Sequence, residues 1–404
     1  MMSEGESAGF KGPRKAASEL PQPSAEAMAH SERLTALIHE AIAQGGGQIG
    51  FDRFMELALY APGLGYYSAG SRKFGEAGDF VTAPELSSLF SRCLAHQCAE
   101  VLSAINRGDI LEFGAGSGVM AADILAELAA LDCLPEHYYI LELSAELRAR
   151  QQETILARVP QLAERTVWLD GLPEAGFHGV VLANEVLDAM PVHRFCIRDG
   201  KLRELYVVAD GEGFALQGGE PTTEVAERLA LLQQQVDFTE GYESELNLRA
   251  EDWVRSIGDF LSQGVVLLID YGFPRSEFYH PQRSSGTLMC HYRHRAHDDP
   301  FRWVGLQDIT SHVDFTAAAR SALQADLHLG GYTTQAHFLL ANGLDTLLAD
   351  SDPNDVERHM ALMQGVKCLT LPSEMGERFK VLGLLKGLDM NLRGFTLRDF
   401  CERL

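Results

Sequence analysis

Residues 109–128 read DILEFGAGSGVMAADILAEL, and this stretch decides the fold. It opens with DILEF, an apolar run of strand length, and continues through three glycines at alternate positions: Gly114, Gly116 and Gly118. The remainder has the apolar spacing of a helix. A strand that passes through a glycine loop into a helix begins a parallel sheet, and the backbone amides at the helix start approach a ligand there. The stretch therefore predicts an α/β protein with a ligand site at the carboxyl end of this strand.

Further apolar runs of strand length alternate with helical patterns along the chain. They are YYILEL from residue 138, TVWL from 166, GVVLAN from 179 and GVVLLIDYG from 264. Such alternation predicts a doubly wound, mostly parallel Rossmann-like sheet. We expect a last strand within ERFKVLGLLKG, at 377–387, and consider another at TTQAHFLLA, at 333–341.

The rest of the chain adds an N-terminal helical region and an insertion to this core. Helical patterns precede the first strand, and the pairs Asp199-Gly200 and Asp210-Gly211 are hairpin signals between the fourth and fifth strands. The first residues are rich in Ser, Ala, Glu and Pro. The predicted organisation is a disordered tail at 1–30, an N-terminal helical and lid region at 31–105, the first part of the core at 106–192, an inserted α+β cap at 193–262, and the second part of the core with substrate-side loops at 263–404.

The charge and the apolar runs restrict the partners and the location of the protein. The net charge is -23, with 57 acidic and 34 basic residues. This charge does not suit nucleic acid or an anionic membrane, whereas a cationic substrate or a basic partner fits. No apolar run approaches the roughly 18 residues of a spanning helix, so we expect no membrane insertion. The seven cysteines form no CxxC pair, and we expect a soluble protein in the reducing cytoplasm.

Glu112 indicates what the glycine loop binds. A dinucleotide fingerprint requires glycine at position 119, where this chain has Val119, and no Gly-Lys-Ser/Thr tripeptide of a P-loop occurs. A carboxylate two residues before Gly114 would repel a pyrophosphate, but it would stabilise an ammonium or sulfonium group. The loop is therefore expected to bind a cation, and nicotinamide-dependent oxidoreduction is disfavoured.

The spacing E-x-G-x-G-x-G after a first strand resembles motif I of class I S-adenosylmethionine-dependent methyltransferases. The resemblance implies S-adenosyl-L-methionine as the cofactor, with the loop around its methionine part. It also implies that Glu142, at the end of YYILEL, accepts hydrogen bonds from both ribose hydroxyls, because a carboxylate offers two acceptor oxygens. Asp170, after TVWL, matches the position near the adenine. The implied cofactor site thus includes Glu112, Gly114, Gly116, Gly118, Glu142, Asp170 and Asn184.

The stretch ANEVLDAMPVHRF, at 183–195, begins where the methyl acceptor lies in this class of enzymes. Asn184, Glu185 and Asp188 are therefore the candidate catalytic residues. If the acceptor is an arginine, a carboxylate can hold the guanidinium through two parallel hydrogen bonds and orient one nitrogen. Glu185 is the candidate for that role. The alternative is that Glu185 is only a helix-start carboxylate stabilised by the helix dipole.

Seven ordered blocks narrow the resemblance to the MidA-like family. They are GDFVTAPE from residue 78, EFGAGSG, NEVLDAMP, DYG from 270, GTLMCHYRHRAHDDP from 286, QDITSHVDF from 307 and GERFKVLGLLKG from 376. The family includes a mitochondrial protein that dimethylates an arginine of a respiratory complex I subunit, which implies protein arginine N-methylation here. It also implies a lid over the cofactor formed by Gly78, Asp79, Thr82 and Pro84. Many relatives have ELGPGRG where this chain has EFGAGSG, and the missing basic residue puts an anion contact in doubt.

His291, His294 and His297 are spaced three apart in HYRHRAHDD. The arginines between them argue against a cation site, so no metal is expected. Two interpretations remain open: polar closure near the acceptor pocket, joined by His312 and Asp314, or ordinary hydrogen bonds that fix loops.

The leading functional hypothesis is a protein arginine methyltransferase that acts on a basic or arginine-bearing segment. The alternatives are methylation of a small molecule and a catalytically inactive cofactor-binding assembly factor. The acceptor, the methylation state of the product and the oligomeric state stay open at this level.

Overall fold

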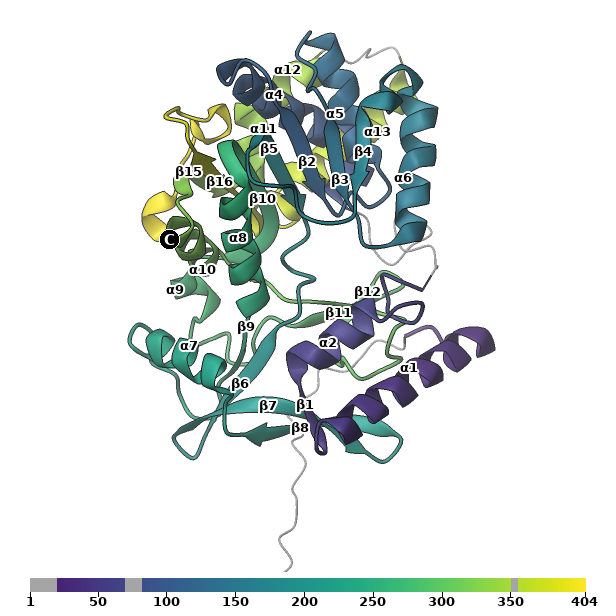
Figure 1. Cartoon of the computed structure of the whole chain (residues 1–404), viewed down its shortest axis with the longest axis vertical. Helices are drawn as coiled ribbons and strands as arrows, with labels where there is room; N and C mark the ends of the chain where they lie inside the picture. Colours follow the sequence, from purple (N-terminus) through teal and green to yellow (C-terminus); the bar gives the residue numbers. More distant parts are fainter. Residues whose placement is uncertain (1–19, 70–81, 350–354) are drawn as a thin grey trace, which may run out of the picture. The chain divides into compact units, whose positions relative to one another are not determined.

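A computed structural model describes residues 20–69, 82–349 and 355–404 (Figure 1). The described chain divides into two compact units. Unit 1 comprises residues up to 69, 191–246 and 279–311, and unit 2 comprises residues 82–190, 247–278 and the described residues from 312 onward. Both units are therefore assembled from segments that are far apart in the sequence.

Unit 2 contains an eight-stranded sheet in which five consecutive strands, up to one edge, are parallel. They follow the order β4-β3-β2-β5-β10, with β16 antiparallel beside β10 and β15 antiparallel beside β16. The short strand β14 pairs in parallel with the end of β10. The strands are β2 (Asp109–Phe113), β3 (Tyr138–Leu141), β4 (Thr166–Leu169), β5 (Phe177–Asn184), β10 (Leu261–Phe273), β14 (Val313–Asp314), β15 (His328–Thr334) and β16 (Phe379–Lys386). The predicted mostly parallel, doubly wound sheet is confirmed.

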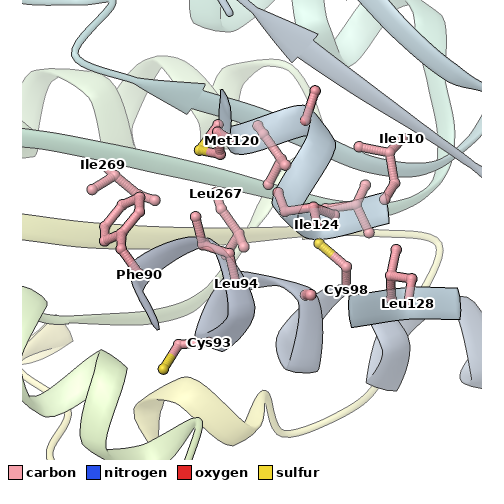
Figure 2. Close-up of a cluster of buried hydrophobic side chains, with 14 of the residues drawn as sticks. Phe90, Cys93, Leu94, Cys98, Ile110, Met120, Ile124, Leu128, Leu267 and Ile269 are labelled. Atoms are coloured by element: carbon pink, nitrogen blue, oxygen red, sulfur yellow. The ribbon is translucent and has the colours of Figure 1, made fainter. Parts of the chain in front are cut away.

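Helices cover both faces of this sheet. On β2, Ile110 packs into one core cluster with residues of α4 (Ser88–Ala104) and α5 (Val119–Ala130), as Figure 2 shows. The next residue, Leu111, packs into a second cluster with α8 (Leu248–Phe260) and α10 (Phe315–Gln324). Because both faces are buried, the strands read as continuous apolar runs without polar alternation.

The other helices of unit 2 connect or flank these strands. They are α3 (Ala83–Leu86), α6 (Ala145–Arg158), η1 (Pro160–Arg165), α9 (Arg275–Phe278), α11 (Gln335–Ala341), α12 (Leu344–Ala349), α13 (Val356–Thr370), α14 (Met375–Arg378), η2 (Arg393–Phe395) and η3 (Cys401–Arg403). The strand considered at 333–341 is wrong, because β15 ends at Thr334 and α11 follows at once. The Thr334 hydroxyl accepts a hydrogen bond from the backbone N–H of His337 at 3.4 Å, so this residue caps the helix.

Unit 1 combines helices with two antiparallel sheets of five and three strands. Its elements are α1 (Ala25–Gln44), β1 (Gln48–Gly50), α2 (Phe51–Tyr60), β6 (His193–Arg198), β7 (Lys201–Asp210), β8 (Gly213–Gly219), α7 (Thr223–Gln233), β9 (Glu243–Leu246), β11 (Met289–Tyr292), β12 (Arg295–His297) and β13 (Asp308–Thr310). Asp199 and Gly200 both have positive φ, 52° and 66°, and join β6 to β7 as the hairpin signal predicted. The inserted α+β region is therefore present.

Two element positions differ from the ranges expected from the sequence. The first helix begins at Ala25, within the range expected as a tail, because the Ser24 side chain accepts a hydrogen bond from the Ala27 N–H and caps it. Helix α8 lies within the expected cap range of 193–262, yet its Val254 and Ile257 are buried in the second core cluster of unit 2. Among the described residues, none of the helices has the length and apolar composition needed to span a membrane.

Candidate functional site

The loop after β2 has a backbone shape that only glycine adopts easily. Gly114, Gly116 and Gly118 have φ of 65°, 52° and 81°. The Gly114 N–H donates to the Leu141 carbonyl at 3.1 Å, which ties the loop to the end of β3. A Cβ atom on Gly118 would lie 2.9 Å from the Cα of Gln151 on α6. The loop thus passes close to α6 and presents backbone at the carboxyl end of β2.

Glu112 lies in the interior of the sheet, two residues before the loop. It is 1% exposed and accepts a hydrogen bond of 2.6 Å from the Tyr138 hydroxyl. Burial, opposed by the Tyr138 hydrogen bond and supported by the charge of Glu142, raises the pKa of Glu112 to about 7. The charge state of this carboxyl therefore depends strongly on any nearby cation.

Glu142 follows β3 and is held by two donors. Its Oε1 accepts from the Ser144 N–H at 2.9 Å, and its Oε2 accepts from Nε2 of Gln151 at 2.9 Å. Burial raises the pKa of Glu142. The same Nε2 donates to the Gly116 carbonyl at 3.1 Å, and Oε1 of Gln151 accepts from the Trp168 indole at 2.9 Å. Sequence reasoning missed Gln151, because its polar helical stretch does not distinguish it from its exposed neighbour Gln152.

Asp170 stands directly after β4 with a side chain that is 92% exposed. Its Oδ1 accepts from Nη2 of Arg148 at 2.9 Å, and the same nitrogen donates to the Leu169 carbonyl at 2.8 Å. Arg148 therefore fixes the end of β4, and Asp170 lies at the same edge of the sheet as Glu142.

Only part of the expected lid lies within the described residues. Gly78 and Asp79 lie outside them. Thr82 is the N-terminal capping position of the short helix α3, and the buried Pro84 stands in its first turn. In that helix Glu85 accepts a hydrogen bond from the Ser117 hydroxyl of the glycine loop. This hydrogen bond between two side chains links helix α3 to the glycine loop.

Asn184 and Glu185 lie where β5 ends. Glu185 has a φ of 54°, which is the left-handed region that a residue with a side chain rarely adopts, and its N–H donates to the Ile269 carbonyl at 2.9 Å. Nδ2 of Asn184 donates to Oε1 of Glu185 at 3.3 Å. Within the described part of the chain, the buried Oδ1 of Asn184 has no hydrogen-bond partner. This strained turn therefore carries polar atoms at the site predicted for the acceptor.

Asp188 and Asp270 form a buried pair beside this turn. Asp270 is fully buried and accepts hydrogen bonds from the N–H groups of Leu187, Asp188 and Tyr271 at 3.0, 3.2 and 2.9 Å. Burial raises the pKa of Asp188 to about 6 and raises that of Asp270 well above its usual range, with Asp188 as the next cause. The Oδ1 of Asp188 is buried and makes no hydrogen bond to any described residue.

Sequence reasoning quoted Asp270 within DYG but gave it no role. The available signal was its position near the end of the strand that runs parallel to β5. We call Glu185, Asp188 and Asp270 the carboxylate cluster.

The histidines do not form a common site in unit 1. His294 lies in the tight turn between β11 and β12 with a φ of 59°, and burial lowers the pKa values of His291 and His297. Across the described ranges, no group of three metal-ligand side chains comes together.

His312 and Asp314 belong to unit 2. His312 stacks on Phe273 with ring centroids 5.3 Å apart. Asp314 caps α10 by accepting from the Ala317 N–H at 3.1 Å and pairs with Arg275 at 3.0 Å. These contacts favour a loop-fixing role for Asp314, whereas polar closure near an acceptor stays a prediction.

Comparison with known proteins places this site in a family. The family model of an S-adenosyl-L-methionine-dependent methyltransferase matches residues 93–333. The crystal structure of a Burkholderia thailandensis protein bound to S-adenosyl-homocysteine is 46% identical, covers 96% of this chain and 100% of that chain, and has a TM-score of 0.92.

Two curated relatives are similar over most of their length. The mitochondrial protein arginine methyltransferase NDUFAF7 homolog of Drosophila melanogaster is 27% identical over 92% of this chain and 89% of its own. The human mitochondrial protein arginine methyltransferase NDUFAF7 is 28% identical over 84% and 80%. These matches confirm the family resemblance and the S-adenosyl-L-methionine cofactor predicted from the motifs.

Proposed function

This chain belongs to the family of S-adenosyl-L-methionine-dependent methyltransferases, and we propose that its methyl acceptor is the guanidinium group of an arginine in a protein. The observation that carries the proposal is the carboxylate cluster at the ends of β5 and β10. Two of its members, Asp188 and Asp270, are 4% and 0% exposed. Ionised carboxylates buried beside one another are unfavourable unless a proton or a cation compensates them, and a guanidinium supplies such a cation.

The residues at the ends of β2 and β3 fit the cofactor. The three glycines have positive φ, and Gly118 also allows the loop to approach α6, where an added Cβ would lie 2.9 Å from the Gln151 Cα. We propose that this loop holds the methionine part, that Glu142 holds the ribose hydroxyls, and that Asp170 lies near the adenine. The unpartnered Oδ1 of Asn184 suits a donor group of the cofactor. When bound, the cofactor supplies an electrophilic methyl group on a sulfonium.

The carboxylate cluster then has two tasks. Glu185 holds the guanidinium fork and orients one nitrogen toward the methyl group. The cofactor would supply the methyl group and keep the electron pair of the broken S–C bond, so the methylated nitrogen would have one proton to lose to the chain. An ionised carboxylate of the cluster accepts that proton, and Asp188 with its unpartnered Oδ1 is the candidate. Asp270 acts through the backbone by fixing the turn that carries Asp188.

The relatives support an arginine acceptor, because the Drosophila and human proteins are both named as protein arginine methyltransferases. The net charge of -23 also suits a basic protein segment. A small-molecule acceptor and a catalytically inactive assembly factor are the two alternatives that an experiment must separate.

The test is incubation of the purified protein with methyl-labelled S-adenosyl-L-methionine and an extract of cells that lack this protein. We expect label in protein, on arginine after acid hydrolysis. The exposed Glu153 on α6 provides a matched control, because Glu153→Gln should label arginine normally whereas Glu185→Gln should not. Label in small molecules would contradict the arginine acceptor. Binding of S-adenosyl-homocysteine without any transfer would favour the inactive assembly factor.

A further inference from the structure

Gln151 is a fully buried polar side chain in the middle of a helix. Its exposed fraction is 0%, and it lies on α6. A side-chain amide has two N–H donors and one carbonyl acceptor. Both donors and the acceptor of Gln151 are used, toward Gly116, Glu142 and Trp168. Burial of an amide is unfavourable without such partners, so this residue is satisfied only in this arrangement.

The three partners of Gln151 belong to three successive strand ends. Gly116 lies in the loop after β2, Glu142 follows β3, and Trp168 lies on β4. No other neutral side chain of this length offers two donors and an acceptor in one plane. Gln151 therefore fixes the spacing between the glycine loop and Glu142, to which the proposed function assigns the methionine part and the ribose of the cofactor.

The hydrogen bonds leave Glu142 with a defined acceptor capacity. Each carboxylate oxygen accepts about two hydrogen bonds. Oε1 already accepts from the Ser144 N–H and Oε2 from Gln151, at 2.9 Å each. The Leu143 N–H also stabilises the charged carboxylate, so few acceptor sites are left on the two oxygens, and vicinal hydroxyls supply donors for them.

We infer that Gln151 is a positioning residue that holds the Glu142 carboxylate for bidentate recognition of the cofactor ribose. The inference rests on the placement of the ribose at Glu142 in the proposed function, but not on the identity of the methyl acceptor. Gln151 itself acts through Glu142 and the Gly116 carbonyl. Its loss should therefore weaken recognition of the ribose hydroxyls more than recognition of the rest of the cofactor.

The test compares Gln151→Met with Gln152→Met by calorimetric titration of the full-length protein with S-adenosyl-homocysteine. Both variants make the same chemical change on α6, but Gln152 is exposed. We expect the Kd to rise about tenfold for Gln151→Met, because hydrogen bonds to a charged group are lost. The Kd of Gln152→Met should be unchanged.

A second ligand separates positioning from a general structural role. The 2′-deoxy analogue of S-adenosyl-homocysteine should bind the wild type more weakly than the parent ligand does. Gln151→Met should lose most of this discrimination. In the double variant with Glu142→Gln, the two losses should not add, since both act on the same hydroxyls.

Three results would overturn the inference: unchanged affinity in Gln151→Met, an equal loss of affinity for both ligands, or unchanged ribose discrimination in Glu142→Gln. If Gln151→Met does not fold, Trp168→Phe removes the indole N–H that donates to Gln151, together with part of the ring, and should show a smaller loss of the same discrimination. Unchanged discrimination in that variant also contradicts the inference. Because no acceptor is present in these titrations, failure of arginine methylation would leave their result intact.

Discussion

The polar side chains on the two halves of the carboxyl edge of the sheet differ in their hydrogen-bond partners. On the cofactor side, at β2 and β3, Glu112 is bonded to Tyr138, and both oxygens of Glu142 accept hydrogen bonds. On the acceptor side, at β5 and β10, Oδ1 of Asn184 and Oδ1 of Asp188 are buried without partners among the described residues. A buried unsatisfied group costs about 1–3 kcal/mol of stability. The difference supports the proposal that the chain itself preorganises the carboxylates at β2 and β3, whereas bound groups complete the open acceptor atoms at β5 and β10.

The largest effect is expected on the acceptor side. Glu185→Gln should lower the rate of methyl transfer by about 10²–10³, as loss of a preorganised electrostatic group does. The Kd for S-adenosyl-homocysteine should stay the same, since the cofactor side is untouched. Single-turnover transfer and calorimetry measure the two quantities. Near-normal transfer by Glu185→Gln would show that Glu185 does not hold the methyl acceptor.

On the cofactor side, Gly118→Ala should raise the Kd for S-adenosyl-homocysteine roughly thirtyfold, the range expected from backbone strain and displaced neighbours. Gly118 has a φ of 81°, and the added Cβ would lie 2.9 Å from the Gln151 Cα. Gly213→Ala on β8 is the control, because its Cβ would meet only the Asp210 carbonyl, at 3.8 Å. Equal affinities in the two variants would show that the loop geometry does not matter for binding.

Asp188→Asn should lower transfer about tenfold, which is less than the roughly 10²–10⁴-fold of a general base, because the other carboxylates of the cluster remain. It should also raise the melting temperature at neutral pH. The pKa of Asp188 is raised from 3.8 to about 6, so the folded protein binds this proton more tightly than the unfolded chain. Its contribution to stability is present below pH 3.8 and is lost as the pH rises through about 6.

Thermal unfolding from about pH 5 to about pH 8, a range that spans the raised pKa, checks this prediction. The wild type should lose stability over this range more steeply than Asp188→Asn. In the wild type, transfer should increase as the pH rises through about 6, because Asp188 must be ionised to accept a proton. If Asp188→Asn is less stable than the wild type at neutral pH, the contrast between the β2–β3 half and the β5–β10 half of the sheet edge is contradicted.

The smallest effect concerns Glu112. Glu112→Gln should lower the preference for S-adenosyl-L-methionine over uncharged S-adenosyl-homocysteine about fivefold, which corresponds to one screened charge pair. In the wild type the preference should grow as the pH rises through about 7. Tyr138→Phe should shift that rise to higher pH, because the Tyr138 hydrogen bond lowers the pKa of Glu112. An unaltered preference in Glu112→Gln would limit this carboxyl to a structural role.

The sequence was sufficient for the core of the fold. Strand β2 is buried on both faces, so its apolar run marks both ends of the strand. At TTQAHFLLA a strand passes into a helix without a glycine or proline between them. Only the hydroxyl of Thr334 marks the change, and its role as a cap depends on three-dimensional contacts.

The site was predictable where its residues directly follow an apolar run. Glu142 and Glu185 stand in that position, and the structure places them at the ends of β3 and β5, although their roles stay predictions. Gln151 and Asp270 were missed for a physical reason. Their partners are distant in sequence, such as Gly116 for Gln151 and Leu187 for Asp270, so only the folded chain shows that they organise the site.

The pairing of β16 with β10 has a consequence for incomplete protein synthesis. β16 runs antiparallel to β10 from Gly264 to Tyr271, beside the strand that carries Asp270. A chain terminated before Phe379 would present this apolar strand as an open edge, which is a template for aggregation. A stop codon immediately before the codon of Phe379 should therefore yield an insoluble product, even though every residue of the proposed site has been translated.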